Sequence, residues 1–159
     1  MRDHYLRAET LIPLPRSEVF AFFAAAENLE RITPRELRFA IATPLPLTMA
    51  EGLRIDYRLN LMGVPFRWRT LISRWEEGSC FVDEQLSGPY ALWVHTHTFA
   101  DHPGGTLVRD EVRYRLPLFP IGEVAVPLVR HQLRRIFTHR AAAIADTLGA
   151  APTSSTVEV

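Results

Sequence analysis

The sequence predicts an α+β domain in which a curved antiparallel sheet of about seven strands wraps around one long C-terminal helix. Three observations lead to this prediction. Apolar and polar residues alternate near the N-terminus and through most of the middle of the chain, the period-2 pattern of half-buried strands. Short connections join the middle segments, which favours antiparallel neighbours. A long stretch with helical spacing of apolar residues occurs only before Gly149.

Size and charge limit the functions that the chain can have. Its 159 residues, 47% of them hydrophobic, fit one globular domain, which we place at residues 1–149, followed by a flexible tail at 150–159. Acidic and basic side chains balance at 18 each, so no basic surface is available for a phosphate backbone and we expect no nucleic-acid partner. Every basic residue is arginine, and the absence of lysine excludes Schiff-base chemistry.

The sequence shows no sign of export or of membrane insertion. Cys80 is the only cysteine, so an intrachain disulfide cannot form. Charged side chains occupy the first ten residues, where a signal peptide has an apolar segment. No apolar run approaches the roughly 20 residues that cross a bilayer. We therefore expect a cytoplasmic protein without stable membrane insertion.

The N-terminal elements are one strand and two short helices. Alternation over Tyr5–Ile12 predicts the first strand. Two prolines end it, and a short helix is expected from Arg16 to about Glu27, with an apolar face whose aromatic residues we assign to the core. A second short helix is expected over Leu29–Thr33, because the residue that precedes Pro34 is disfavoured in the helical conformation.

Six further strands and the long helix complete the domain. The strands are expected at Leu37–Thr43, Leu53–Leu61, Pro65–Trp75, Cys80–Leu86, Ala91–Ala100 and Thr106–Leu116. The helix runs from about Glu123 to Leu148, and Pro127 predicts that its regular part begins or is kinked there. A curved sheet around a long helix can enclose a cavity between the two.

Several segments in the second half of the chain resemble a known superfamily. They are FVDEQLSGPY at Phe81–Tyr90, WVHTHTF at Trp93–Phe99, GGTL at Gly104–Leu107, DEVRY at Asp110–Tyr114, and Leu116-Pro117. Together with the order of elements over residues 1–149, they resemble the START-like (SRPBCC, polyketide cyclase/dehydratase-like) superfamily, in particular an uncharacterised bacterial subfamily. The resemblance implies the helix-grip, or Bet v 1-like, fold. It also implies hydrophobic small-molecule binding, as in many members, or ring closure and dehydration, as in a minority.

Alternation also indicates which side chains face the interior. In the last strand, charged residues alternate with a row that contains Asp110, so Asp110 faces inward. In the preceding strand, the bulky row with His95 and His97 fills a wide curved sheet better than the opposite row does. Strand pairing then puts Asp83 roughly opposite His95. The residues that we expect to contact a ligand are Tyr57, Trp68, Gln85, Trp93, His95, His97, Phe99, Asp110, Val112, Tyr114, Phe137 and Arg140.

Asp83, His95, His97 and Asp110 allow several interpretations. They could form a buried hydrogen-bond network that fixes strand register, or a polar floor that orients the oxygen atoms of a ligand. They are also the candidate catalytic residues for proton transfer, because histidine titrates near neutrality and burial raises carboxyl pKa values. Two histidines and one carboxylate could bind a metal, but an HxH pattern occurs by chance often, and we expect neither metal nor cofactor.

Arg140 is the unexpected residue of the C-terminal helix. At about 100° per residue it falls in the middle of the apolar stripe, close in angle to Leu133. A guanidinium there needs a partner, because arginine cannot escape by losing its proton. The partner could be Asp110 or Asp83, which would lock the helix onto the sheet, or the carboxylate or carbonyl of a ligand. A third outcome is that the long side chain reaches solvent.

These observations favour a protein that binds a hydrophobic small molecule, such as a lipid, a polyketide-like compound or an aromatic compound, between the sheet and the C-terminal helix. An enzyme of the cyclase, dehydratase or isomerase type is the first alternative. A ligand-free interaction or chaperone-like domain is the second. No nucleophile elbow, phosphate-binding loop or dinucleotide-binding motif is present to favour other enzyme classes.

Overall fold

The computed structural model describes all 159 residues. In chain order the elements are β1 (His4–Ile12), α1 (Arg16–Ala24), α2 (Glu27–Arg31), the 3₁₀ helix η1 (Arg35–Leu37), β2 (Ala40–Ile41), β3 (Arg54–Leu61), β4 (Val64–Glu76), β5 (Cys80–Ser87), β6 (Leu92–His102), β7 (Gly105–Arg115), the 3₁₀ helix η2 (Ile121–Ala125), α3 (Val126–Leu148) and β8 (Ser154–Glu158). The predicted order of strand, two short helices, strands and long helix is confirmed.

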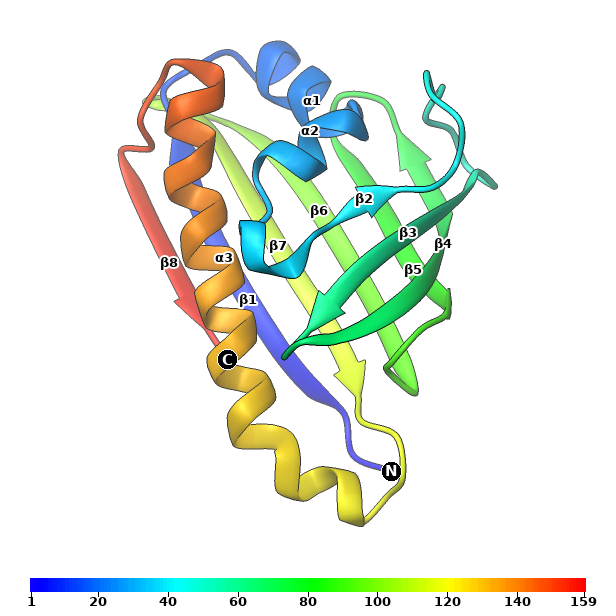
Figure 1. The fold of residues 1–159 in the computed structure, drawn as a ribbon. Helices are drawn as coiled ribbons and strands as arrows, with labels where there is room; N and C mark the ends of the chain where they lie inside the picture. Colours follow the sequence, from blue (N-terminus) through cyan, green and yellow to red (C-terminus); the bar gives the residue numbers. More distant parts are fainter.

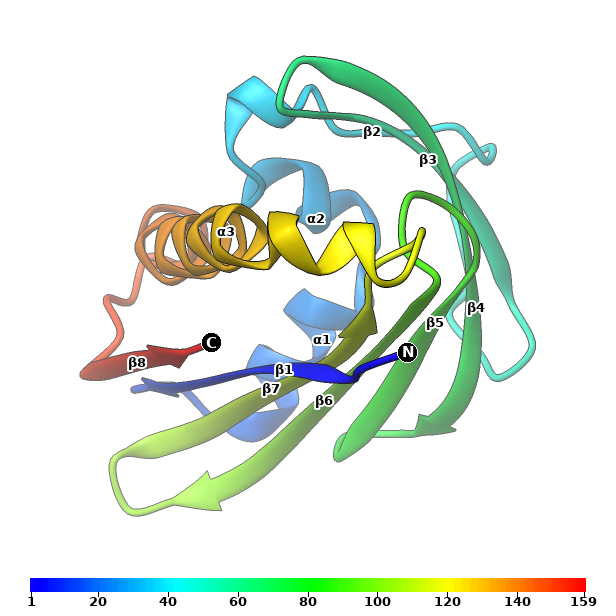
Figure 2. The same cartoon turned by 90° about the horizontal axis from the view of Figure 1, so that it is seen from below.

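All eight strands belong to one antiparallel sheet with the order β2-β3-β4-β5-β6-β7-β1-β8. The sheet curves strongly, and α3 lies inside the curve (Figures 1 and 2). Helices α1 and α2 cover one end of this concave face (Figure 1). The predicted α+β architecture, a curved antiparallel sheet around a long C-terminal helix, is therefore confirmed.

Two segments differ from the sequence-based expectation. The strand expected at Leu37–Thr43 is reduced to Ala40–Ile41, because the preceding turn is a 3₁₀ helix that ends in a left-handed residue, Arg38. The tail expected to be flexible contains β8, which pairs with β1 and packs beside α3 (Figure 1). The outer edge of β1 would otherwise present unpaired backbone groups, and β8 satisfies them.

Helix α3 begins and ends near the expected positions. Pro127 lies in its first turn, where its missing N–H costs nothing, and Gly149 ends it in the left-handed conformation. None of the helices combines the length and apolar character that a membrane span requires.

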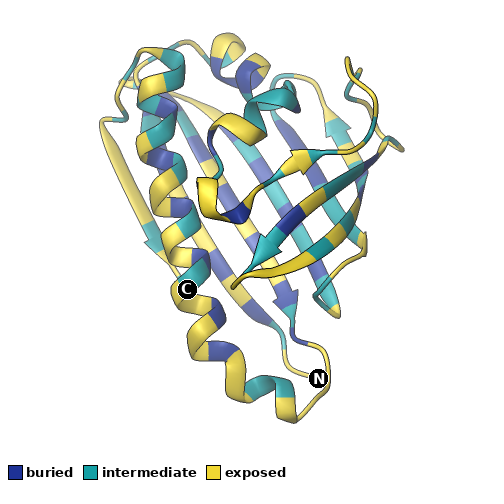
Figure 3. Cartoon of the chain, in the orientation of Figure 1, coloured by how far each residue is buried: buried dark blue, intermediate teal, exposed yellow.

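The core consists of two clusters on the concave face. One joins β1 and β7 to the first half of α3 and includes Leu6, Val112 and Tyr114. The other is rich in aromatic side chains and joins α1 to the far ends of β5, β6 and β7. Buried positions alternate regularly with half-buried or exposed ones along β6 and β7, and less regularly along β3 and β4 (Figure 3). The part of the concave face under β3 and β4 is therefore incompletely filled.

Candidate functional site

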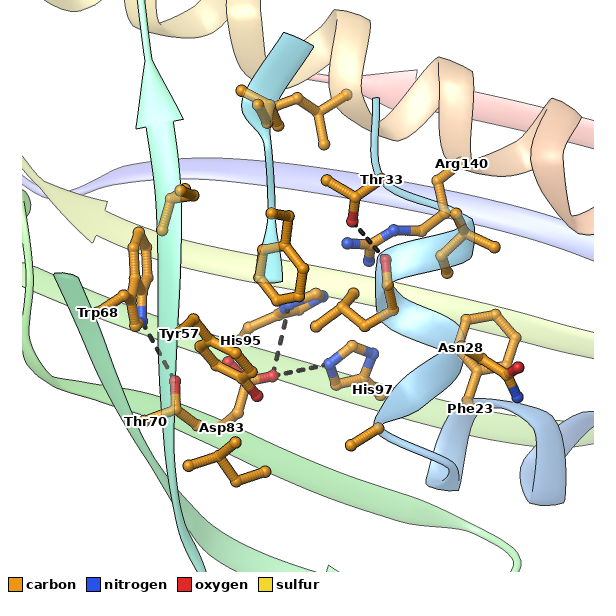
Figure 4. Close-up of a pocket in the computed structure, with 18 of the residues that line it drawn as sticks. Phe23, Asn28, Thr33, Tyr57, Trp68, Thr70, Asp83, His95, His97 and Arg140 are labelled. Atoms are coloured by element: carbon orange, nitrogen blue, oxygen red, sulfur yellow. Dashed lines mark hydrogen bonds and ion pairs between the residues drawn. The ribbon is translucent and has the colours of Figure 1, made fainter. Parts of the chain in front are cut away.

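A cavity of about 170 Å³ lies where β3 and β4 curve away from α3. Of the 28 residues that line it, 21 are hydrophobic, so its wall favours an apolar occupant. The sheet contributes inward side chains such as Tyr57 and Trp68, and α3 contributes Leu133, Phe137 and Arg140. The segment from α1 to β2 closes the side opposite the sheet (Figure 4).

Four polar side chains meet on the inner face of the sheet and form what we call the His–Asp ring: Asp83 from β5, His95 and His97 from β6, and Asp110 from β7. The strand register brings them together, since Asp83 lies opposite His95 and His97 lies opposite Asp110. The expectation that His95, His97 and Asp110 face inward, with Asp83 opposite His95, is confirmed.

Each histidine of the ring contacts both carboxylates. His95 Nε2–H donates to Asp110 Oδ1 at 2.8 Å, and His97 Nε2–H donates to Asp83 Oδ2 at 2.9 Å. His97 Nδ1 lies 2.9 Å from Asp110 Oδ1 but is not aligned for a hydrogen bond, and His95 Nδ1 lies 3.6 Å from Asp83 Oδ2. The two imidazole centroids are 3.7 Å apart. The ring is thus a compact, largely buried polar network.

The two histidines of the ring differ in the direction of their pKa shifts. Burial lowers the pKa of His95, and the neighbouring His97 lowers it further. Burial also lowers the pKa of His97, but the two flanking carboxylates outweigh it and raise that pKa above its ordinary value. Burial raises the pKa values of Asp83 and Asp110, and the neighbouring imidazoles reverse this and leave both below their usual range. The arrangement favours two carboxylates, a protonated His97 and a neutral His95, with one net negative charge.

Arg140 lies at the cavity end of this network, on α3. Its guanidinium carbon is 4.7 Å from the centre of the Phe137 ring, a cation–π contact. Its Nε is shielded from solvent and has no hydrogen-bond partner. Asp110 and Asp83 act on it only at longer range, and burial lowers its pKa. Of the three alternatives for Arg140, the ion pair with Asp83 or Asp110 is therefore wrong, and each carboxylate is hydrogen-bonded to a histidine instead.

The other polar groups of the cavity wall differ in whether they have partners. Trp68 Nε1–H donates to Thr70 Oγ1 at 3.2 Å, and the Thr33 hydroxyl donates to the Leu29 carbonyl. Tyr57 forms no hydrogen bond to another protein group, and burial raises the pKa of its hydroxyl, which stays protonated. Tyr57, Arg140 and Tyr90, which also lines the cavity, therefore carry hydrogen-bond donors without a protein partner.

Asp83, His95 and His97 are also the only group in the protein with the composition and proximity of a metal site. Their potential ligand atoms all lie within 4.8 Å of one another. A divalent cation would have to replace the hydrogen bond between His97 and Asp83, while Asp110 would orient both imidazoles from behind, as carboxylates do around bound metals. As a cation-free network, the same atoms can move a proton between His97 and the carboxylates.

The structure places seven of the twelve expected ligand-contacting residues in the cavity wall: Tyr57, Trp68, Trp93, His95, His97, Phe137 and Arg140. The other five lie elsewhere. Phe99, Val112 and Tyr114 belong to the packed core. Asp110 is buried and does not line the cavity. Gln85 bonds the backbone of Tyr90 instead and so holds the β5–β6 turn.

Part of the wall was not anticipated from the sequence. The helix α1 carries three phenylalanines, all of which we assigned to the core from the sequence. Phe22 and Phe23 line the cavity, and only Phe20 is confined to the core. Thr33 and Phe39 reach the cavity from the irregular segment after α2. The apolar residues of that segment were visible in the sequence, but no periodicity showed which way they point.

Comparison with solved structures identifies the fold. The chain is similar to TTHA0849 from Thermus thermophilus, with a TM-score of 0.70, 20% identity, and 90% of this chain and 95% of that chain covered. Ms6760 from Mycobacterium smegmatis is similar with a TM-score of 0.66 and 16% identity, and the match covers 91% of this chain and 90% of that chain. Major latex-like protein 151 from Panax ginseng is similar with a TM-score of 0.62 and 13% identity, and the match covers 91% of this chain and 97% of that chain. No protein-family model and no curated protein matches the sequence. The predicted START-like, Bet v 1-like helix-grip fold is confirmed.

Proposed function

We propose that this START-like helix-grip domain binds a hydrophobic small molecule, such as a lipid, a polyketide-like compound or an aromatic compound, in the cavity between its sheet and α3. The observation that carries the proposal is the apolar wall, in which 21 of 28 lining residues are hydrophobic. Concave, mostly apolar spaces with a few polar groups at one end are the usual form of small-molecule sites.

The polar end of the cavity supports binding more than catalysis. Both carboxylates of the His–Asp ring are hydrogen-bonded to histidines, and His97 lies between them. A general base needs a lone pair within reach of its substrate, whereas these hydrogen bonds already engage Nε2 of both histidines and one oxygen atom of each carboxylate. We therefore assign the ring to fixing the strands and forming the floor of the cavity.

A fluorescence titration with N-phenyl-1-naphthylamine, an uncharged apolar probe that brightens in apolar surroundings, tests the proposal. We expect saturable binding with one site per chain. A competing explanation is adsorption to the exposed apolar residues that follow β7, which are Leu118, Phe119, Ile121, Val124 and Leu128.

Two variants separate these explanations. Leu59→Trp places a bulky ring on the cavity wall and should reduce probe affinity at least about tenfold by filling the space. The matched control, Ile121→Glu with Val124→Glu, alters the exposed segment and should leave affinity unchanged. If the control abolishes binding and Leu59→Trp does not, or if the wild type does not bind, the proposal is wrong.

A further inference from the structure

We propose that the ligand of this cavity is an amphipathic acid, an apolar molecule with one carboxylate that binds the guanidinium of Arg140. This inference rests on the proposed function and specifies the chemical class of the ligand. It follows from the guanidinium of Arg140, a charged group of the cavity wall that forms no hydrogen bond or ion pair within the protein.

Arg140 is held in position but left without acceptors. Its side chain lies over Phe137, whose ring centre is 4.7 Å from the guanidinium carbon. It enters the cavity wall from α3, and no nitrogen of the guanidinium donates a hydrogen bond within the protein (Figure 4). An arginine side chain offers five N–H donors and does not deprotonate. Arg140 is half-buried, and leaving its shielded Nε–H unbonded is costly.

Other arginines of the chain show the contrast. Arg7, Arg69 and Arg109 lie on the outer surface, and each donates from Nε to a carboxylate on a neighbouring strand. Such exposed ion pairs contribute little to stability in water, yet they form on the outer surface of the sheet. Arg140, where a partner would matter most, has none. Asp83 and Asp110 balance its charge from a distance, and one oxygen atom of each is hydrogen-bonded to a histidine.

Three residues of the wall, Arg140, Tyr57 and Tyr90, carry hydrogen-bond donors that no protein group accepts, and a ligand group placed among them needs acceptor atoms. The hydroxyls of Tyr57 and Tyr90 stay protonated, because burial raises the pKa of both. A ligand group that satisfies donors must supply acceptor oxygen atoms, and a carboxylate matches the planar fork of a guanidinium with two parallel hydrogen bonds. A hydroxyl or a single carbonyl would engage only part of that fork. The apolar remainder of the wall then covers the hydrocarbon part of the molecule.

The test compares two ligands of equal chain length, decanoate and 1-decanol, as competitors that displace N-phenyl-1-naphthylamine. We expect the wild type to bind decanoate at least about tenfold more tightly than decanol, the scale of a charge-assisted bidentate contact. Arg140→Met should abolish this preference. Arg140→Lys keeps the charge without the planar fork and should retain part of it. Arg134→Met, an exposed arginine of the same helix, is the matched control and should keep the full preference.

The outcomes distinguish this inference from the proposed function. If the wild type binds the probe but is displaced equally by acid and alcohol, the inference is wrong and hydrophobic binding stands. The same holds if folded Arg140→Met or Arg140→Lys retains the full wild-type preference. If the wild type does not bind the probe, the proposed function fails first. Thermal melting of each variant shows that it is folded, and Arg140→Lys carries the test if Arg140→Met is not.

Discussion

The inner faces of β7 and β3 look alike in sequence and differ in what covers them. In β7 the inward residues Val112 and Tyr114 are completely buried, because β1 and α3 pack against them. In β3 all four inward residues line the cavity, and Tyr57 and Leu61 are only half-buried, whereas Ile55 and Leu59 are buried. Both strands alternate between inward and outward residues. Alternation therefore identifies the inward face of a strand but does not show whether protein or a ligand fills the space beyond it.

The arrangement of α3 explains the difference. The helix packs beside β1 and β8 and crosses the concave face at a distance from β3 and β4 (Figure 2). Side chains of α1, α2 and the segment up to β2 cover part of the remaining space. We call the inner faces of β1 and β7 the packed half and those of β3 and β4 the cavity half.

The largest expected difference between the halves is in the cost of removing the same side chain. Leu6→Ala in β1 removes a fully buried leucine from the packed half and should lower the free energy of unfolding by about 3 kcal/mol. Leu61→Ala borders a space that is already open and should cost about 1 kcal/mol or less. Urea denaturation measures both values, and equal losses would show that the cavity half is packed as tightly as the other.

A second prediction concerns the boundary between the halves, where the His–Asp ring lies. Asp110→Asn removes the carboxylate that contacts both histidines and should lower the free energy of unfolding by about 2 kcal/mol, since charged hydrogen bonds contribute more than neutral ones. Because Asp110 does not line the cavity, the affinity for N-phenyl-1-naphthylamine should change less than about twofold. A large loss of probe affinity in a stable variant would instead assign the ring to ligand binding.

The third and smallest expected effect is a pH dependence of stability. The pKa of His97 is raised above 6.5 in the folded protein. Its contribution to stability is therefore complete below pH 6.5 and is lost as the pH rises through the folded-state pKa. His97→Gln should cost more stability near pH 6 than near pH 9, as measured by urea denaturation at both values. The exposed His131→Gln serves as control. An equal or larger cost near pH 9 would mean that His97 is neutral in the fold.

Sequence reasoning predicted the fold and the ring because both depend on local patterns. Alternation along β6 and β7 selected His95, His97 and Asp110 as inward residues, and a short turn between neighbouring strands placed Asp83 opposite His95. These relations follow from the two-residue period of strands and from pairing across a turn.

The residues that sequence reasoning misplaced depend on contacts between distant elements. Val112 and Tyr114 were assigned to the cavity, but the position of α3 decides that they are packed. Phe39 lines the cavity because an irregular segment folds back over β3, where its ring lies 4.9 Å from that of Tyr57. Arg140 was correctly placed on the inner face of α3, but its expected partner depended on how the histidines use the carboxylates.

A crystal structure of the protein with bound N-phenyl-1-naphthylamine tests the central claim most directly. We predict that the probe lies between α3 and the inner faces of β3 and β4, in contact with Trp68 and Phe39, while the side chains of β7 keep their packing. A probe found only on the exposed segment that follows β7, or a cavity closed by its own side chains with no probe inside, would contradict the claim that this fold encloses a binding site for a hydrophobic small molecule.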